Sequence, residues 1–390
     1  MKVVHITYQD TGGAAIAVKR IHESLLEANI DSNLLLLWNN TNSIKNCTAI
    51  HDYTNTFNKY KYKAIAYTYS KVLNFLSHKG SLYIRVNYLN SLYRIHNHPL
   101  IKEADIIHLH WINRFIDLPS FLAKVKKPII WTFHDMTPFT GGLSYEGGVD
   151  ARMHQKFLRN SVRKLESFKC SNLTGVATSN GFLKKAVNYG LFKMQDLVKI
   201  PYPISIKTFY DRDKLQARKQ LGLPLQKKIV LFVAADINNK RKGLGFILSR
   251  LDSYKDNDIT FVVVGDGFNK REGFISLGVI MDENKMALAY AAADLFVTPA
   301  VEEAFGQTTL ESICCGVPVV SFETAGAKEL VIDGFNGFIV READDVVLRE
   351  TIIKAISFNF DRKAIAQHAS TNYNNITIAD QYIKLYASKL

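Results

Sequence analysis

Two glutamates eight residues apart carry the clearest chemical signal in this sequence. Glu303 and Glu311 lie in TPAVEEAFGQTTLESICCGVPVV, a segment whose pattern predicts a strand end, a loop, a helix and the next strand. Gly306 stands where the helix opens and Gly316 where it ends. The first turn of a helix presents backbone N–H groups to a phosphate, and Gly306 keeps the approach free of side-chain bulk. The segment therefore predicts a phosphate-binding site.

The two carboxylates indicate what is attached to that phosphate. Glu303 precedes the helix at the carboxyl end of a strand, where open α/β sheets bind their ligands. Glu311 lies about 7.5 Å along the helix axis from Gly306. Carboxylates so close to a phosphate would repel it unless they accept hydrogen bonds from sugar hydroxyls. A nucleotide diphosphate joined to a sugar suits both, with one carboxylate at the sugar and the other at the ribose.

A basic turn and a histidine add two further candidates. Arg241 and Lys242 follow the strand KIVLFVA, and a cation there would neutralise a departing diphosphate. A solvated basic turn over 240–242 is the alternative. His134 ends the strand PIIWTFH, at a position that faces a ligand cleft in α/β sheets. The alternative is a structural histidine whose nitrogens are satisfied by protein partners.

Two more histidines raise the question of a metal. His108 and His110 lie two apart on one strand face, so together with His134 they could be read as metal ligands. Because no third ligand has a diagnostic spacing, we predict no metal. Gly12 and Gly13 form a tight loop before the first helix, where a substrate could approach the backbone, although they do not make a dinucleotide fingerprint.

The elements that must position these residues alternate in type along the whole chain. Short apolar runs such as VVHITY, PIIWTFH and KIVLFVA recur between helical patterns, which predicts an α/β protein with parallel sheets. Pro201 and Pro203 interrupt this pattern and separate two series of about six strands each. We therefore predict domains at 1–203 and 204–374, with a last helix at about 375–390 that could pack on either domain.

Composition bounds the class of protein. The chain has 390 residues, 47% of them hydrophobic, and only four cysteines without framework spacing, which excludes disordered and disulfide-scaffold classes. No stretch approaches a membrane span, and Met1 leads directly into a strand-like run instead of a signal peptide. These features predict a cytoplasmic protein.

The net charge of +13 lies entirely in one half of the chain. Residues 1–200 hold 26 basic and 13 acidic residues, whereas residues 201–390 hold 23 of each. The excess concentrates in 51–100 and 151–200, interleaved with Tyr, Phe and Leu. It fits an N-terminal half resting on anionic lipid at the inner face of the membrane. General solubility charge, with 54–99 as a helical pair covering the sheet, is the alternative. No nucleic-acid module accompanies the charge, so nucleic-acid binding is not expected.

Several segments, in order along nearly the whole chain, resemble the family-four retaining glycosyltransferases. The spacing of Glu303 and Glu311 within EAFGQTTLESICCGVPVV resembles the signature of that family. Other matching segments are WTFHDMTPFTGG, RKG at 241–243, VVVGDG at 262–267 and AGAKELVIDGFNGFIV at 325–340. The resemblance implies the GT-B fold, in which two Rossmann-like domains face each other across a cleft, the first binding acceptor and the second binding nucleotide sugar.

The resemblance also implies roles for individual residues. Glu303 would contact the donor sugar, Glu311 the ribose, and Lys242 the diphosphate. His134 would be the active-site histidine. The remaining donor-binding positions are Gly13, Arg241, Gly265, Ile280, Phe305, Gly306 and Gln307. One departure is Asp236, which stands where the family usually carries an arginine, so that Arg241 or Lys240 would have to supply the second positive charge.

The function expected from the resemblance is transfer of a sugar with retention of configuration and without metal or cofactor. The donor would be a UDP- or GDP-type nucleotide sugar. The acceptor is inferred from the charge of the N-terminal half and not from the resemblance: it would be a glycan or lipid-linked glycan, as in surface-polysaccharide assembly. A GT-B epimerase or phosphorylase would share the fold. A non-catalytic protein that binds nucleotide sugars is the alternative outside the enzymes.

Overall fold

The computed structural model describes residues 1–41, 44–52, 89, 91, 93–113, 115–146, 151–169, 171–250, 254 and 258–390. The chain forms two compact units. Unit 1 contains residues 1–178, 183–201 and 378–390, and unit 2 contains residues 179–182 and 202–377. The change of unit at 201/202 lies beside the predicted boundary, and the last residues of the chain belong to unit 1. The predicted helical pair at 54–99 lies largely outside the described residues.

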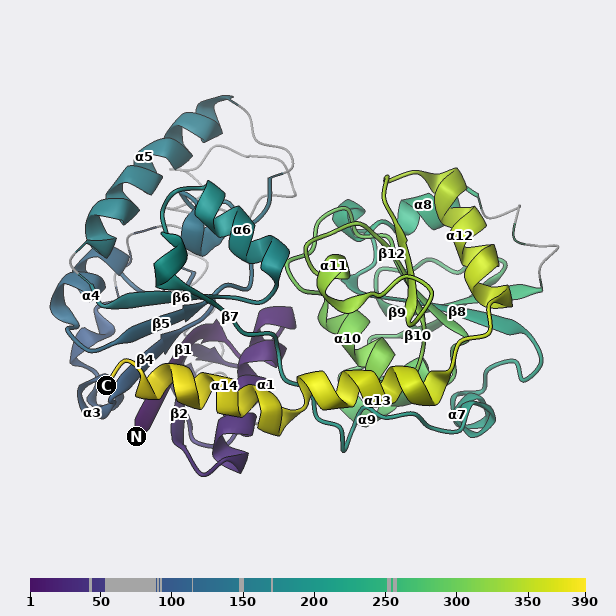
Figure 1. Cartoon of the computed structure of the whole chain (residues 1–390), viewed down its shortest axis with the longest axis horizontal. Coiled ribbons are helices and arrows are strands. Elements are labelled where there is room, and N and C mark those ends of the chain that lie inside the picture. Colours follow the sequence, from purple (N-terminus) through teal and green to yellow (C-terminus); the bar gives the residue numbers. More distant parts are fainter. Residues whose placement is uncertain are drawn as a thin grey trace. The chain divides into compact units, whose positions relative to one another are not determined.

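Unit 1 is built on a seven-stranded parallel sheet with the order β3-β2-β1-β4-β5-β6-β7 (Figure 1). The strands are β1 (Lys2–Gln9), β2 (Asp31–Asn39), β3 (Cys47–Asp52), β4 (Ile106–Leu109), β5 (Ile129–Thr132), β6 (Leu173–Ala177) and β7 (Leu197–Lys199). The strand order reverses between β1 and β4, and such a switch point is where doubly wound sheets bind ligands. Both central strands are buried, as expected of a parallel sheet with both faces covered.

The helices of unit 1 come from both ends of the chain. They are α1 (Gly13–Glu27), α3 (Pro99–Glu103), α4 (Leu118–Lys124), α5 (Ala151–Phe168), α6 (Asn180–Asn188), whose first residues fall in unit 2, and α14 (Asn375–Ala387). Helix α14 returns to the sheet through two tyrosines, because the Tyr386 hydroxyl lies 2.6 Å from His108 Nδ1 and the Tyr382 hydroxyl 3.1 Å from Thr132 Oγ1. All four side chains are buried.

Unit 2 has a six-stranded parallel sheet with the order β10-β9-β8-β11-β12-β13. Its strands are β8 (Lys228–Asp236), β9 (Ile259–Asp266), β10 (Phe274–Gly278), β11 (Leu295–Thr298), β12 (Val319–Phe322) and β13 (Gly337–Val340). Its helices are α7 (Lys214–Leu221), α8 (Leu244–Leu248), α9 (Glu283–Ala291), α10 (Gln307–Cys314), α11 (Ala327–Leu330), α12 (Asp345–Ser357) and α13 (Arg362–Tyr373). The predicted α/β class is thus confirmed in both units.

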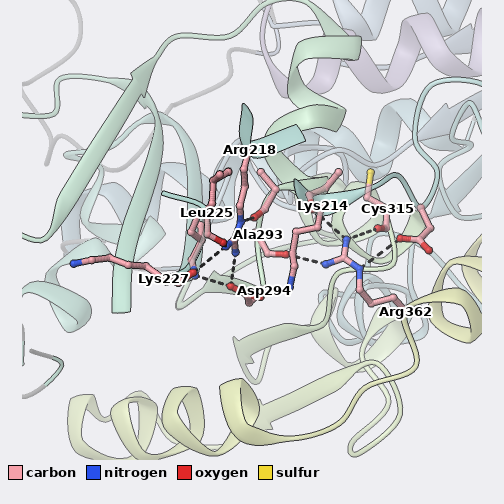
Figure 2. A network of polar contacts seen from close by, with 12 residues as sticks. Lys214, Arg218, Leu225, Lys227, Ala293, Asp294, Cys315 and Arg362 are labelled. Atoms are coloured by element: carbon pink, nitrogen blue, oxygen red, sulfur yellow. Dashed lines mark hydrogen bonds and ion pairs between the residues drawn. The ribbon is translucent and has the colours of Figure 1, made fainter. Parts of the chain in front are cut away.

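A polar network joins the helices of unit 2 to the starts of its two central strands, β8 and β11 (Figure 2). Arg218 on α7 donates to Asp294 Oδ2 at 2.6 Å and to the carbonyl oxygens of Ala292, Leu225 and Lys227, each at 2.9 Å. Arg362 similarly donates to three carbonyl oxygens that end α9 and α10. The bond to Ala292 satisfies a buried carbonyl group, and the other bonds are partly buried.

The described residues contain no helix that could cross a membrane. Among the residues placed by the structure, no helix combines the length and apolar character that a membrane span requires.

Candidate active site

The predicted phosphate-binding helix is present as α10. Gly306 precedes it with φ = +90°, a left-handed conformation that favours glycine. A Cβ on Gly306 would lie 3.1 Å from Thr309 Oγ1 and 3.8 Å from Glu303 Cγ, so the glutamate side chain lies against the start of the helix. The first N–H groups of α10 point back along its axis and have no intrahelical acceptor, which suits an anion. Phe305 and Gly306 are buried, and Gln307 is half-buried.

Glu303 forms ion pairs with Lys242 and Arg241, the two candidate cations of the basic turn. Its Oε2 lies 2.6 Å from Lys242 Nζ and 3.5 Å from Arg241 Nη1. Arg241 also donates to the carbonyl oxygen of Glu302. Burial by itself would raise the pKa of Glu303, but the charges and hydrogen bonds of Lys242 and Arg241 outweigh it and leave the pKa below its usual value. Glu303 is therefore an ionised acceptor, and one carboxylate aligns two cations beside the helix start.

Glu311 lies on the buried side of α10 and accepts a hydrogen bond. The Tyr290 hydroxyl, from α9, donates to Glu311 Oε2 at 2.9 Å. Glu311 is 7% exposed and Tyr290 is fully buried. The bond fixes one carboxylate oxygen of Glu311. Sequence reasoning missed Tyr290, because nothing in its spacing relates it to a glutamate on another helix.

The turn that carries the cations has a defined shape. Residues 240–242 form one 3-10 turn, started by Asn239, whose side chain accepts from the backbone N–H of Arg241 at 3.1 Å. Gly243 ends the turn at φ = +81°, and a Cβ there would come within 1.8 Å of the Pro299 carbonyl oxygen. Only glycine fits this position, so the turn lies close against the β11 end and directs Lys242 toward Glu303.

Asp236, which departs from the family pattern, ends β8 in an exposed position. Its Oδ1 accepts from the backbone N–H of Asn238 at 3.0 Å, so the side chain shapes the connection to the basic turn. The structure thus pairs Arg241 with the site and leaves Asp236 in a local turn.

The other predicted donor-binding residues occupy strand and helix ends. Gly265 lies near the end of β9 at φ = +144°, where a Cβ would come within 1.8 Å of the Ala234 carbonyl oxygen. Ile280 is half-buried between β10 and α9, and Gly13 begins α1 in unit 1 in an exposed position. None of the three has a side-chain role that the structure defines.

His134 follows β5 in unit 1 and belongs to a group of histidines. Its Nε2 lies 3.0 Å from His110 Nδ1, and His110 Nε2 lies 2.9 Å from His5 Nδ1. Burial lowers the pKa of His134 to about 3. His134 therefore has a protein partner, as in its structural alternative, and also a strand-end position, as in its active-site interpretation.

The loop after His134 is tied down by a buried lysine. Lys164, on α5, donates to the carbonyl oxygens of Thr137 and Thr140, the latter at 2.8 Å. Burial lowers the pKa of Lys164 to about 7, although the charge of Asp135 opposes the shift. Asp135 in turn accepts from the backbone N–H of Thr137 at 2.8 Å. The part of WTFHDMTPFTGG that follows His134 is therefore held in place by Lys164 and Asp135.

Ring nitrogens of His5, His108 and His110 lie within 4.8 Å of one another and could in principle hold a metal ion. This trio differs from the one considered from sequence, because His5 replaces His134. Both ring nitrogens of His108 and of His110 already make hydrogen bonds within the protein. A metal would have to displace these bonds, so the group is built for hydrogen bonding.

A cavity of about 620 Å³ in unit 2 adjoins the basic turn, with residues of α8 and the start of α12 in its wall. Lys240 and Gly243 line it, but Glu303, Glu311 and Lys242 do not. We therefore do not assign it to the donor.

Two Rossmann-like units, with a carboxylate and two cations gathered at a helix N-terminus in the second, define the class of proteins with the GT-B fold. Residues 227–357 match the family described as Glycosyl transferases group 1. The phosphatidyl-myo-inositol mannosyltransferase of Mycobacterium leprae is 26% identical over 305 residues, which cover 73% of each chain. The chain is a glycosyltransferase.

Solved structures support the fold over the full length. The sucrose-phosphate synthase of Thermosynechococcus elongatus has a TM-score of 0.70 at 17% identity, covering 100% of this chain and 99% of its own. The Anabaena protein HepE, solved in complex with UDP-glucose, has a TM-score of 0.65 at 17% identity, and the match covers 100% of each chain. The GT-B fold predicted from the sequence is therefore confirmed.

Proposed function

We propose that this glycosyltransferase moves a sugar, with retention of configuration, from a nucleotide diphosphate sugar to a hydroxyl of a glycan or lipid-linked glycan. The observation that carries the proposal is the ion-paired group of Glu303, Lys242 and Arg241 at the start of α10. The UDP-glucose complex of HepE supports a donor of the UDP type. The similarity to a mannosyltransferase that acts on phosphatidyl-myo-inositol supports an acceptor linked to lipid.

Each residue of the group has one task in this reaction. The N–H groups that open α10 and the Lys242 ammonium receive the negative charge that develops on the departing diphosphate. Glu303 accepts from hydroxyls of the donor sugar, and Glu311, one oxygen of which is fixed by Tyr290, accepts from the ribose. Neither carboxylate serves as nucleophile. The acceptor hydroxyl attacks from the face that the diphosphate leaves, and a phosphate oxygen takes its proton.

Donor identity is tested with the purified full chain. Nucleotide sugars with UDP or GDP are screened by thermal shift, and the strongest binder is used for kinetics. We expect Glu303→Gln to lower kcat, because the sugar is misplaced, and Glu311→Gln to raise the donor KM, because ribose binding weakens. Near-normal kinetics in both variants would contradict the assignment. Donor binding without transfer or hydrolysis would instead indicate a non-catalytic binding protein.

We further propose that unit 1 attaches to anionic lipid through α5. Leu158, Val162 and Leu165 lie one turn apart on this helix and are 55%, 57% and 40% exposed. Spacings of three and four residues place them in one stripe. Arg159 and Arg163 are exposed beside it, and another face of the helix is anchored by buried residues, among them Phe157 and Lys164. An exposed apolar stripe bordered by arginines suits the interface of an anionic membrane.

Vesicle co-sedimentation of the full chain tests this attachment. Binding should require anionic lipid and weaken with salt. It should fall several-fold in the double variant Leu158→Gln, Val162→Gln. The matched control is Val346→Gln, Val347→Gln on α12 of unit 2, two valines that are 39% and 44% exposed. Equal binding to neutral and anionic vesicles would rule the proposal out.

A further inference from the structure

The proposed function leaves three buried histidines of unit 1 without a task. His5 on β1, His108 on β4 and His110 just after β4 are 0%, 0% and 2% exposed. His5 pairs in register with His108 on the neighbouring strand, and His110, two residues further, lies on the same face of the sheet. The ring centroids of His5 and His110 are 5.2 Å apart in a stacked arrangement. The parallel register therefore packs imidazole against imidazole.

Hydrogen bonds connect this group to His134. They run from His5 Nδ1 to His110 Nε2 at 2.9 Å and from His110 Nδ1 to His134 Nε2 at 3.0 Å. His108 lies outside this line, because its two nitrogens are bonded to Tyr386 and Thr132. His5, His110 and His134 thus form a three-histidine chain that begins in the core and ends at the carboxyl end of β5.

The three-histidine chain is electrically neutral at physiological pH. Burial lowers the pKa of His5, His110 and His134, and for His5 and His110 the proximity of the other histidines lowers it further. A neutral imidazole carries one N–H and one acceptor nitrogen. Each bond therefore has one donor, and fixing one tautomer fixes the next. Only two arrangements remain, and they differ in the direction of all donations.

The inner end of the chain decides between the two. His5 Nε2 is buried and makes no hydrogen bond with the described residues. If His134 donated inward, this nitrogen would carry a buried proton without an acceptor. If His5 donates outward, the same nitrogen keeps only an unused lone pair. Buried N–H groups without acceptors are the rarer case, so outward donation is favoured.

We propose that His5 and His110 are positioning residues that hold His134 as its Nδ1-protonated tautomer. His5 Nδ1–H donates to His110 Nε2, and His110 Nδ1–H donates to His134 Nε2. The proton of His134 is then on Nδ1, and the ring is fixed in orientation. This inference rests on the proposed function only for the role of His134 as the active-site histidine that the resemblance implies. The tautomer itself is a property of unit 1.

Nitrogen NMR of the full chain labelled with ¹⁵N-histidine tests the tautomer directly. The His134→Gln variant assigns the resonance of His134. We expect His134 and His110 to give the pattern of Nδ1–H imidazoles, constant from pH 6 to 8. An Nε2–H pattern for His134, or an average of both tautomers, would overturn the proposal. If His134 were the Nδ1–H tautomer but the protein had no transferase activity, the proposed function would be contradicted. The proposal for the three-histidine chain would still hold.

Two substitutions at one position test whether positioning matters to the reaction. The amide nitrogen of His110→Asn occupies the place of Nδ1 and can still donate to His134, whereas that of His110→Gln occupies the place of Nε2 and cannot. Both variants lose one of the two bonds, so a purely structural role would affect them alike. We expect the Asn variant to keep kcat within about threefold and the Gln variant to lose at least tenfold, with similar donor KM. Equal losses in kcat would contradict a positioning role.

Discussion

At the residue scale, the basic turn carries two lysines whose surroundings differ. Lys242 contacts Glu303 at 2.6 Å, whereas Lys240 is exposed on the same turn. Only a cation aligned with the start of α10 can stabilise charge on a departing diphosphate. The structure therefore places Lys242, and not Lys240, beside Glu303, and the leaving-group role of Lys242 stays a prediction.

We expect Lys242→Ala to lower kcat at least 100-fold, since one lost electrostatic contact to a transition state costs about 3 kcal/mol. Lys240→Ala should stay close to the parent enzyme, and Asp236→Ala should cost less than Lys242→Ala. Steady-state kinetics with the preferred donor measure all three variants. If Asp236→Ala were the most damaging change, the phosphate contacts inferred from the resemblance would not apply.

Side chains that act within one motif could be predicted from sequence, and those that act across elements could not. Glu303, Gly306 and Lys242 are candidates from sequence because a strand-loop-helix pattern or a basic turn gives them a local context, and their roles stay predictions. Tyr290 and His5 were not, because each acquires its role from a partner on another element. Such pairs depend on sheet register and helix packing.

At the scale of elements, polar anchors determine how the helices of unit 2 are held. Arg218 is 3% exposed in its side chain, and Asp294 is 11% exposed. Burial would raise the pKa of Asp294, but hydrogen bonds from Lys214 and the Ile229 N–H, with the charges of Lys214 and Arg218, hold it below the usual value. The pair connects α7 with the start of β11.

Removing one partner of this buried pair should destabilise the protein strongly. We expect Arg218→Met to lower the free energy of unfolding by about 3 kcal/mol, because three carbonyl groups lose the arginine as donor and Asp294 keeps only its bonds from Lys214 and the Ile229 N–H. Lys214→Met removes the more exposed partner of the same carboxylate and should cost less than about 1 kcal/mol. Urea titration followed by circular dichroism measures both variants. Similar costs would show that Arg218 is not the anchor.

Most elements of the fold could be predicted because their signals are local. Helix α7 is an example, because Asp213 caps its start and Gly222 ends it in the left-handed conformation. The alternation of strands and helices correctly predicted parallel sheets. The unit to which the last helix belongs could not be predicted, because its tyrosines suit any apolar surface. It is decided by Tyr382 and Tyr386, which reach Thr132 and His108.

At the scale of the whole molecule, the histidine group makes folding dependent on pH. Burial lowers the pKa of His5, His108, His110 and His134 in the folded protein. In the unfolded chain their pKa values return to about 6.5. Below about pH 6.5 the unfolded state binds more protons than the folded state. The contribution of these histidines to stability is therefore complete above that pH, and it is lost as the pH falls toward their pKa values in the folded protein. For His134 that loss continues to about pH 3.

Each of these histidines contributes about 1.4 kcal/mol per pH unit within this window, so four of them give a slope of up to about 5 kcal/mol per unit. Asp135 opposes the trend, because burial raises its pKa and the folded state then binds a proton more readily. We expect the urea midpoint to fall steeply between pH 6.5 and 5, and less steeply in His5→Leu, which removes one buried imidazole. A midpoint that is constant from pH 7 to 5 would show that the group accepts protons while folded.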